Sequence, residues 1–160
     1  KKSLKYQDYA SKTYEDLFTE EQRSGALEYK TTHLESAILW NSNGALTLEA
    51  LPFEAQVSPV FAIVANDLDE DGDQDLLLGG NFYGLKPEIG RQDSNFGVVL
   101  LGDGNGGFVS GSPDKTGIDI RGEVRDAKLL HAAGKGKTIL VGRNNASVIV
   151  FSKAESSVLQ

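Results

Sequence analysis

The sequence predicts a mainly β protein of antiparallel strands that follows a short helical segment. From about residue 33 onward, nine short runs of β-branched, aliphatic and aromatic residues are separated by Gly, Asn, Asp and Pro. No long helical pattern alternates with these runs, which argues against a parallel α/β sheet. Part of the sequence also repeats, and internal repeats of this length are typical of stacked β units.

The N-terminal segment, residues 1–30, is expected to be helical. Within residues 5–27, apolar side chains recur at three- and four-residue spacing and form one stripe along a helix. These side chains are Tyr6, Tyr9, Ala10, Tyr14, Leu17 and Phe18. Thr19 and Gln22 have the spacing of a capping box for a short second helix, which Gly25 could end. We expect the segment to pack on the rest of the fold, and the alternative is a helix that binds a partner.

The second region, residues 31–160, contains nine expected strands. They are Ala37–Trp40, Leu46–Leu48, Val60–Ala65, Leu76–Leu78, Val98–Leu101, Phe108–Val109, Val124–Leu130, Thr138–Val141 and Val148–Phe151. The Gly- and Asn-rich segments Asn41–Gly44 and Gly102–Gly107 predict hairpin turns between neighbouring strands. Asp103 lies in the second of these turns, and we interpret it as a turn residue and not as a metal ligand.

An internal repeat divides this region into units of about residues 33–96 and 97–160. Ala37–Leu46 aligns with Val99–Phe108, Ser58–Ile63 with Gly122–Ala127, and Leu76–Asn81 with Thr138–Asn144 after one slip. A third copy begins at Asn145–Phe151. Each unit supplies four antiparallel strands, which is the content of a β-propeller blade. A closed propeller needs at least four blades, so about two blades would be part of a larger ring or would pair their open edges in another way.

The segment Asp67–Asp75 is the strongest candidate site. It reads D-x-D-x-D-G-x-x-D and holds six acidic residues among nine, directly before an apolar strand. Oxygen donors at alternate positions, with a Gly where the chain must bend sharply, are typical of a short loop that binds Ca²⁺. We expect Gly72 to have a positive φ angle.

Two alternatives to a calcium loop between strands were weighed. An EF-hand needs a helix on each side and a Glu at the twelfth position, but that position is Leu78 and the flanking runs predict strands. The other alternative is an acidic loop that binds no metal. The second repeat has His131–Lys137 at the equivalent place, which is basic. The turn itself therefore does not require carboxylates, and this favours a metal site.

The segment Phe61–Asn81 resembles the FG-GAP repeat, also called the VCBS repeat, which is the blade of integrin-α-like β-propellers. The segments Tyr6–Phe18, Leu51–Gln56 and Gly80–Gly84 resemble the C-terminal region of large secreted FG-GAP proteins of Bacteroidetes. Such proteins often also carry an ASPIC and UnbV domain, which is not visible here.

The resemblance implies one bound Ca²⁺ with a structural role. Carried over by position, the side chains of Asp67, Asp69, Asp71 and Asp75 and the main-chain carbonyl of Asp73 would be its ligands. It also implies a secreted protein, located outside the cell or in the cell envelope, whose loops bind a protein or a carbohydrate. Self-association through open sheet edges is a further expectation.

Composition excludes several other classes of function. The net charge of −7 argues against a nucleic-acid partner, which would need a basic face. Without cysteine, there is no disulfide framework, thiolate metal site or Cys nucleophile. No apolar run approaches the ~20 residues that span a bilayer, so membrane insertion is not expected.

Evidence for catalysis in the sequence is thin, and we expect a protein that is not an enzyme. The two histidines, His33 and His131, lie in no recognisable catalytic or metal-binding motif and are expected at the surface or at a strand edge. Arg91–Ser94 could line a binding face, although a turn or structural salt bridge is the preferred interpretation. Trp40 is expected to be a core residue and not a sugar platform. The alternative function is a propeller fragment of a larger calcium-dependent hydrolase or lyase.

Overall fold

The computed structural model describes residues 5–132 and 136–152 as short helices and nine strands. The helices are α1 (Tyr6–Ala10), α2 (Tyr14–Leu17), α3 (Glu20–Ser24) and α4 (Pro113–Thr116), with a 3-10 turn at Phe53–Ala55. The strands are β1 (Ala37–Ser42), β2 (Ala45–Ala50), β3 (Val60–Asn66), β4 (Asp75–Gly80), β5 (Val98–Gly102), β6 (Phe108–Gly111), β7 (Val124–Ala132), β8 (Gly136–Arg143) and β9 (Ile149–Ser152). All nine expected strands are confirmed. The chain divides into two compact units, Lys1–Leu34 and Glu35–Gln160.

The first unit has three short helices where the sequence pattern predicted a longer one. The reason is a second capping box, because Thr13 and Asp16 start α2 in the same way that Thr19 and Gln22 start α3. Phe18 is extended between these helices, with φ −123° and ψ 133°. The predicted Thr19–Gln22 capping box is confirmed, and Gly25 directly follows α3. No residue of α1, α2 or α3 is buried.

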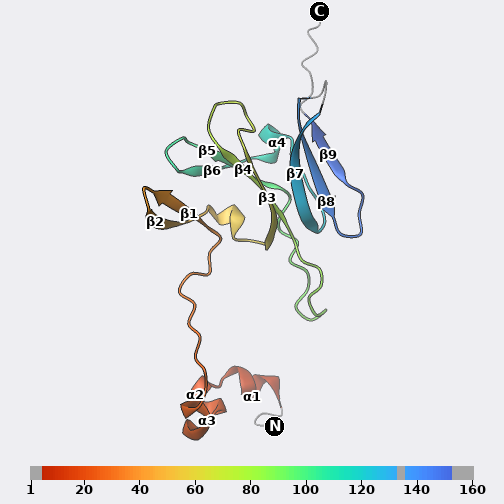
Figure 1. Ribbon diagram of the computed structural model, residues 1–160. Coiled ribbons are helices and arrows are strands. Elements are labelled where there is room, and N and C mark those ends of the chain that lie inside the picture. The colour runs from red at the N-terminus through yellow and green to blue at the C-terminus, as the bar shows by residue number, and fades with distance from the viewer. Residues whose placement is uncertain (1–4, 133–135, 153–160) are drawn as a thin grey trace, which may run out of the picture. The chain divides into compact units, whose positions relative to one another are not determined.

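The described part of the second unit forms three antiparallel sheets, which confirms the mainly β fold (Figure 1). β1 and β2 form a two-stranded sheet, β3 to β6 a four-stranded sheet in chain order, and β7 to β9 a three-stranded sheet. The two-residue turn Asn43–Gly44 joins β1 to β2, and both residues have positive φ angles of 51° and 90°. The interpretation of these sheets as propeller blades stays a prediction.

The sheets do not follow the division at residues 96 and 97. β5 pairs with β4, so one sheet combines the second half of the first sequence unit with the first half of the next. The β3–β4 and β7–β8 hairpins share a register irregularity, after Val60 and after Val124 respectively. When the two hairpins are aligned on these irregularities, Leu77 corresponds to Leu140 and Asp75 to Thr138. This alignment locates the slip that the sequence comparison required between the two copies.

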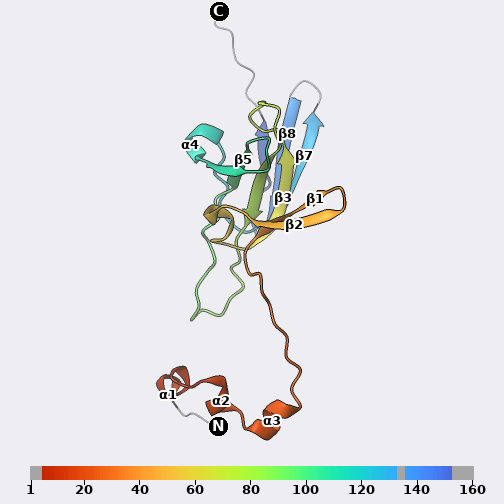
Figure 2. The ribbon, with the colours of Figure 1, turned by 90° about the vertical axis from the view of Figure 1, so that its left-hand side faces the viewer.

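The main core lies between the β3–β6 and β7–β9 sheets, with β3 and β7 side by side in both views (Figures 1 and 2). Alternate residues of β3, β7 and β8 face it, as the period of a β-strand requires. The buried members are Ala62, Val64, Leu77, Val99, Ile118, Ile120, Val124, Ala127, Ile139 and Val141. A smaller cluster around Leu78 and Leu100 covers the other face of the four-stranded sheet. The β3–β4 and β7–β8 hairpins therefore belong to neighbouring sheets that pack on each other.

Candidate metal centre

The acidic segment forms the turn between β3 and β4. The last pair of the hairpin is Asn66 with Asp75, so the eight residues between them make a loop that closes on a rigid ladder. Two loop residues have positive φ angles, Glu70 at 70° and Gly72 at 100°. The predicted conformation of Gly72 is confirmed. Nothing lies within 4 Å of the place where a Cβ atom would be on Gly72, so its backbone conformation is what favours glycine there.

The loop aspartates accept hydrogen bonds from backbone N–H groups further along the loop. Asp67 accepts from Glu70 at 2.6 Å and from Gly72 at 3.3 Å, one bond on each carboxylate oxygen. Asp69 accepts from the N–H of Asp71 at 3.2 Å, and Asp71 accepts from that of Asp73 at 2.8 Å. These bonds turn carboxylates from alternate positions of the chain toward the inside of the loop.

The carboxylates of Asp67, Asp69 and Asp71 come together as a triad. One oxygen from each lies within 4.8 Å of those of the other two. Desolvation raises the pKa of Asp69, and the charges of Asp71, Asp75 and Asp67 raise it further. A cation would relieve this repulsion, and oxygen donors at this spacing are what Ca²⁺ takes as ligands. The donor set and its packing therefore fit a hard divalent cation.

Asp75 has a different role in the structure. Its side chain is fully buried, with an exposed fraction of 0%. One carboxylate oxygen accepts from the N–H of Leu68 at 2.7 Å, and the other accepts from the N–H of Gly102 at 2.9 Å. Asp75 thus fixes the loop to the end of β5. A cation at Asp75 could be bound only through the lone pairs that these two hydrogen bonds leave.

Asp73 turns its carboxylate away from the triad and toward the turn between β5 and β6. A Cβ atom on Gly104 would lie 2.6 Å from one of its oxygens. The main-chain carbonyl of Asp73 stays a predicted ligand. Of the five predicted ligand residues, the structure brings three carboxylates together and places those of Asp73 and Asp75 elsewhere.

Lys137 contacts this loop from the neighbouring sheet. Its Nζ donates a hydrogen bond of 2.7 Å to the main-chain carbonyl of Asp67, which is 70 residues away along the chain. Lys137 lies near the start of β8, at the end of the basic segment His131–Lys137. The sequence alignment treats that segment as the counterpart of the acidic loop, but it gives no sign that the two touch.

Asp103 is engaged within its own turn, as expected. Its Oδ1 accepts from the N–H of Asn105 at 2.9 Å and from that of Gly107 at 2.8 Å. These bonds shape the hairpin between β5 and β6.

Trp40 is half-buried against Phe108, with ring centroids 6.4 Å apart, and its Nε1 donates to Glu49 at 3.0 Å. Trp40 thus packs on Phe108 but belongs to neither core cluster, so the expectation of a core residue is not met.

The sequence interpretation missed a polar network at the opposite end of β4. Asn81 has an exposed fraction of 0% and a φ angle of 80°. Its Oδ1 accepts from the hydroxyl of Ser58 and the N–H of Asn95, both at 2.9 Å. Its Nδ2 donates to the carbonyls of Asn95 and Gly122, at 2.7 and 3.0 Å. The Asn81 side chain therefore ties together segments that the sheets alone do not join. A lone Asn after a strand gives no sequence signal for this.

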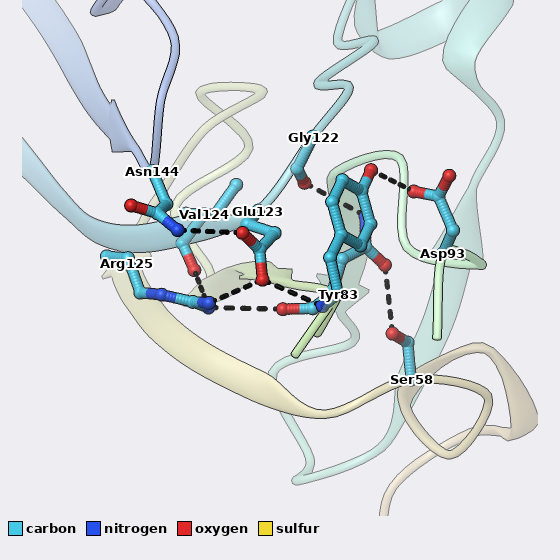
Figure 3. A network of polar contacts seen from close by, with 9 residues as sticks. Ser58, Tyr83, Asp93, Gly122, Glu123, Val124, Arg125 and Asn144 are labelled. Atoms are coloured by element: carbon cyan, nitrogen blue, oxygen red, sulfur yellow. Dashed lines mark hydrogen bonds and ion pairs between the residues drawn. The ribbon is translucent and has the colours of Figure 1, made fainter. Parts of the chain in front are cut away.

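Glu123 forms the second half of this network (Figure 3). It accepts from the N–H of Tyr83 at 2.7 Å, from Arg125 at 2.7 Å and from Asn144 at 2.8 Å. The hydrogen bond from Tyr83 lowers the pKa of Glu123 most, followed by that from Asn144 and the charge of Arg125, while burial opposes them. The guanidinium of Arg125 also lies 4.6 Å from the ring centroid of Phe61. The carboxylate stays ionised at neutral pH and anchors Arg125.

The remaining candidates are the two histidines and the segment Arg91–Ser94. His33 and His131 are exposed, as expected. Arg91 stacks on Tyr83 at 4.7 Å, and the hydroxyl of Tyr83 donates to Asp93 (Figure 3). That hydrogen bond raises the pKa of Tyr83, as do burial and the charge of Asp93. Arg91 and Asp93 thus make structural contacts, which are a ring contact and a tyrosine hydrogen bond and not the turn or salt bridge that the sequence interpretation preferred.

Searches of known protein families, curated proteins and solved structures find no match for this chain. The described helices include none that is both long and apolar enough to cross a membrane.

Proposed function

We propose that this chain is a non-catalytic, calcium-binding β-repeat module in which Ca²⁺ stabilises the turn between β3 and β4. The observation that carries this proposal is the triad of Asp67, Asp69 and Asp71, whose carboxylate oxygens lie within 4.8 Å of one another. The D-x-D-x-D-G-x-x-D pattern supports it independently, because it places a Gly where the turn needs a positive φ angle.

The residues that would hold the ion are Asp67, Asp69 and Asp71, with the main-chain carbonyl of Asp73. Asp75 would contribute through its remaining lone pairs while it keeps the loop attached to β5. A bound cation would supply positive charge to a turn that carries six acidic residues. Because the unfolded loop would not hold the ion in this way, binding would stabilise the folded state.

The wider context of the proposal comes from the resemblance to FG-GAP repeats. The four-stranded sheet β3–β6 and the three-stranded sheet β7–β9 would correspond to successive blades of a propeller in a secreted or surface protein. Loops at one end of such a scaffold would recognise a protein or a carbohydrate. In this view, the ion has a structural role and takes no part in a reaction.

Thermal unfolding in Ca²⁺ and in EDTA tests the proposal. At a free Ca²⁺ concentration about 100 times the dissociation constant, we expect Tm to rise by about 5–10 °C over its value in EDTA. Mg²⁺ should have a smaller effect, because it prefers a rigid octahedral site and loses water reluctantly. Identical melting curves in Ca²⁺ and EDTA, together with no heat of Ca²⁺ binding, would rule the proposal out.

A further inference from the structure

Lys137 contacts the acidic loop from β8, outside the β3–β4 hairpin that contains the loop. It shares a face of β8 with Ile139 and Val141, which are buried in the core between the two larger sheets. Its side chain is half-buried, and its ammonium group reaches the carbonyl of Asp67 at 2.7 Å. A long aliphatic stem along the core edge with a charged head at the surface is the usual arrangement for lysine.

The contact leaves the loop carboxylates available. The described ion pairs join Arg121 to Asp119, Arg125 to Glu123, and Lys128 to Asp126, so none of them involves an aspartate of the loop. Lys137 instead donates to a main-chain oxygen and brings its positive charge beside the turn. A positive charge at this place would oppose the mutual repulsion of the aspartates without occupying the oxygens of the triad.

We propose that Lys137 is a counter-cation built into the fold, which holds the Asp67–Asp75 loop in shape when no metal is bound and lowers its affinity for Ca²⁺. The affinity part of this inference rests on the proposed metal site. A fixed charge of the same sign as the metal stabilises the metal-free loop more than the metal-bound loop, because the ion itself neutralises the carboxylates. Lys137 is thus a positioning residue that determines how much the stability of the fold depends on bound metal.

The test compares Lys137→Met, which keeps the length of the stem and removes the charge, with Lys137→Arg, which keeps the charge. In EDTA, Lys137→Met should have a lower Tm than the unmodified chain, and saturating Ca²⁺ should close most of the gap. Calorimetric titration with CaCl₂ should show Ca²⁺ binding tighter by on the order of fivefold in Lys137→Met. Lys137→Arg should behave like the unmodified chain in all three measurements.

Lys128→Met is the matched control. Lys128 lies on β7 of the same sheet and pairs with Asp126, and both side chains are well exposed. This variant should leave the response to Ca²⁺ unchanged. Equal losses of Tm for Lys137→Met in EDTA and in Ca²⁺ would assign Lys137 a packing role and overturn the inference. So would an unchanged Tm in EDTA.

A double variant decides the case in which Lys137→Met fails to fold in either buffer. Replacing Asp69 by Asn removes one negative charge from the loop, so Asp69→Asn combined with Lys137→Met should recover folding in EDTA. No recovery would contradict a counter-cation role. An unmodified chain whose Tm does not respond to Ca²⁺ would overturn the proposed function. The coupling between Asp69 and Lys137, measured in EDTA, would still support or overturn the role of Lys137.

Discussion

At the residue scale, aspartates of one short segment have opposite environments. Asp67, Asp69 and Asp71 are half-buried or exposed and face one another across the turn. Asp75 is fully buried and accepts from two backbone N–H groups, that of Leu68 in the loop and that of Gly102 at the end of β5. The first three create a negative field that a cation can neutralise, whereas the fourth is part of the scaffold that supports them.

The first prediction concerns Asp71. Its side chain is exposed and accepts one described hydrogen bond, so Asp71→Ala should change Tm in EDTA only slightly. The same change removes one of three clustered carboxylates, so it should abolish the rise of Tm in Ca²⁺. Asp103→Ala is the control, because its carboxylate serves only its own turn in the described structure. Thermal melts of both variants in Ca²⁺ and in EDTA test this prediction. Equal effects of the two changes on the Ca²⁺ response would show that the metal site is not in the Asp67–Asp75 loop.

The second prediction concerns the pH dependence of stability through Glu123. Its pKa is lower in the folded chain than its ordinary value of 4.5. Its contribution to stability is therefore fully present above pH 4.5 and is lost as the pH falls through the folded-state pKa.

Glu123→Gln tests this contribution. We expect the variant to be less stable than the unmodified chain at about pH 7 and to lose less stability on acidification to about pH 3. Urea unfolding curves across this range measure the difference between the two proteins. Parallel curves for the two proteins would show that Glu123 does not titrate in this way.

At the scale of elements, the hairpin between β5 and β6 supports the acidic loop. The N–H of Gly102 bonds to Asp75 at 2.9 Å. A Cβ atom on Gly102 would lie 2.3 Å from the carbonyl oxygen of Gln74, so only glycine fits there. Gly104 makes a similar close approach to the carboxylate of Asp73. The sequence predicted only a hairpin turn between β5 and β6, but its glycines also contact the acidic loop of the candidate site.

The third prediction uses two glycines with nearly the same backbone conformation. Gly104 has a φ angle of 69° and Gly117 one of 68°, but no atom lies within 4 Å of an added Cβ on Gly117. Alanine at either position should cost about 1–2 kcal/mol in backbone strain. Only Gly104→Ala should also displace the side chain of Asp73 and weaken Ca²⁺ binding. Urea unfolding and Ca²⁺ titration separate the two effects, and equal Ca²⁺ affinities in both variants would contradict a supporting role for Gly104.

The sequence predicts the elements of this fold better than their contacts. Short runs of β-branched, aliphatic and aromatic residues between turn residues identified all nine strands, because such runs are a local property. The break before α2 also had a local signal in Thr13 and Asp16, which the sequence interpretation did not use. The roles of Asp75 and Lys137 have no local signal, since they depend on β5 and β8 reaching the loop from distant parts of the chain.

At the scale of the whole second unit, the two larger sheets present equivalent faces that are covered to different degrees. In the four-stranded sheet, the paired residues Leu77 and Val99 are 1% and 2% exposed, because the β7–β9 sheet packs on them. Their counterparts in the β7–β9 sheet are Leu140 and Val150, which form the same cross-strand pair. Val150 is 58% exposed. An uncovered apolar face of this kind is prone to associate.

The fourth prediction is that this face mediates self-association of the chain. Because Val150 lies on the side of β9 away from Ile149, which packs against the main core, Val150→Lys should reduce association without disturbing the packed face. Val109→Lys is the control, since Val109 is 68% exposed on β6 of the other sheet. Light scattering over a range of protein concentrations should show a rising mean mass for the unmodified chain and for Val109→Lys, and a constant monomer mass for Val150→Lys. A constant monomer mass for the unmodified chain would show that this face stays uncovered in solution.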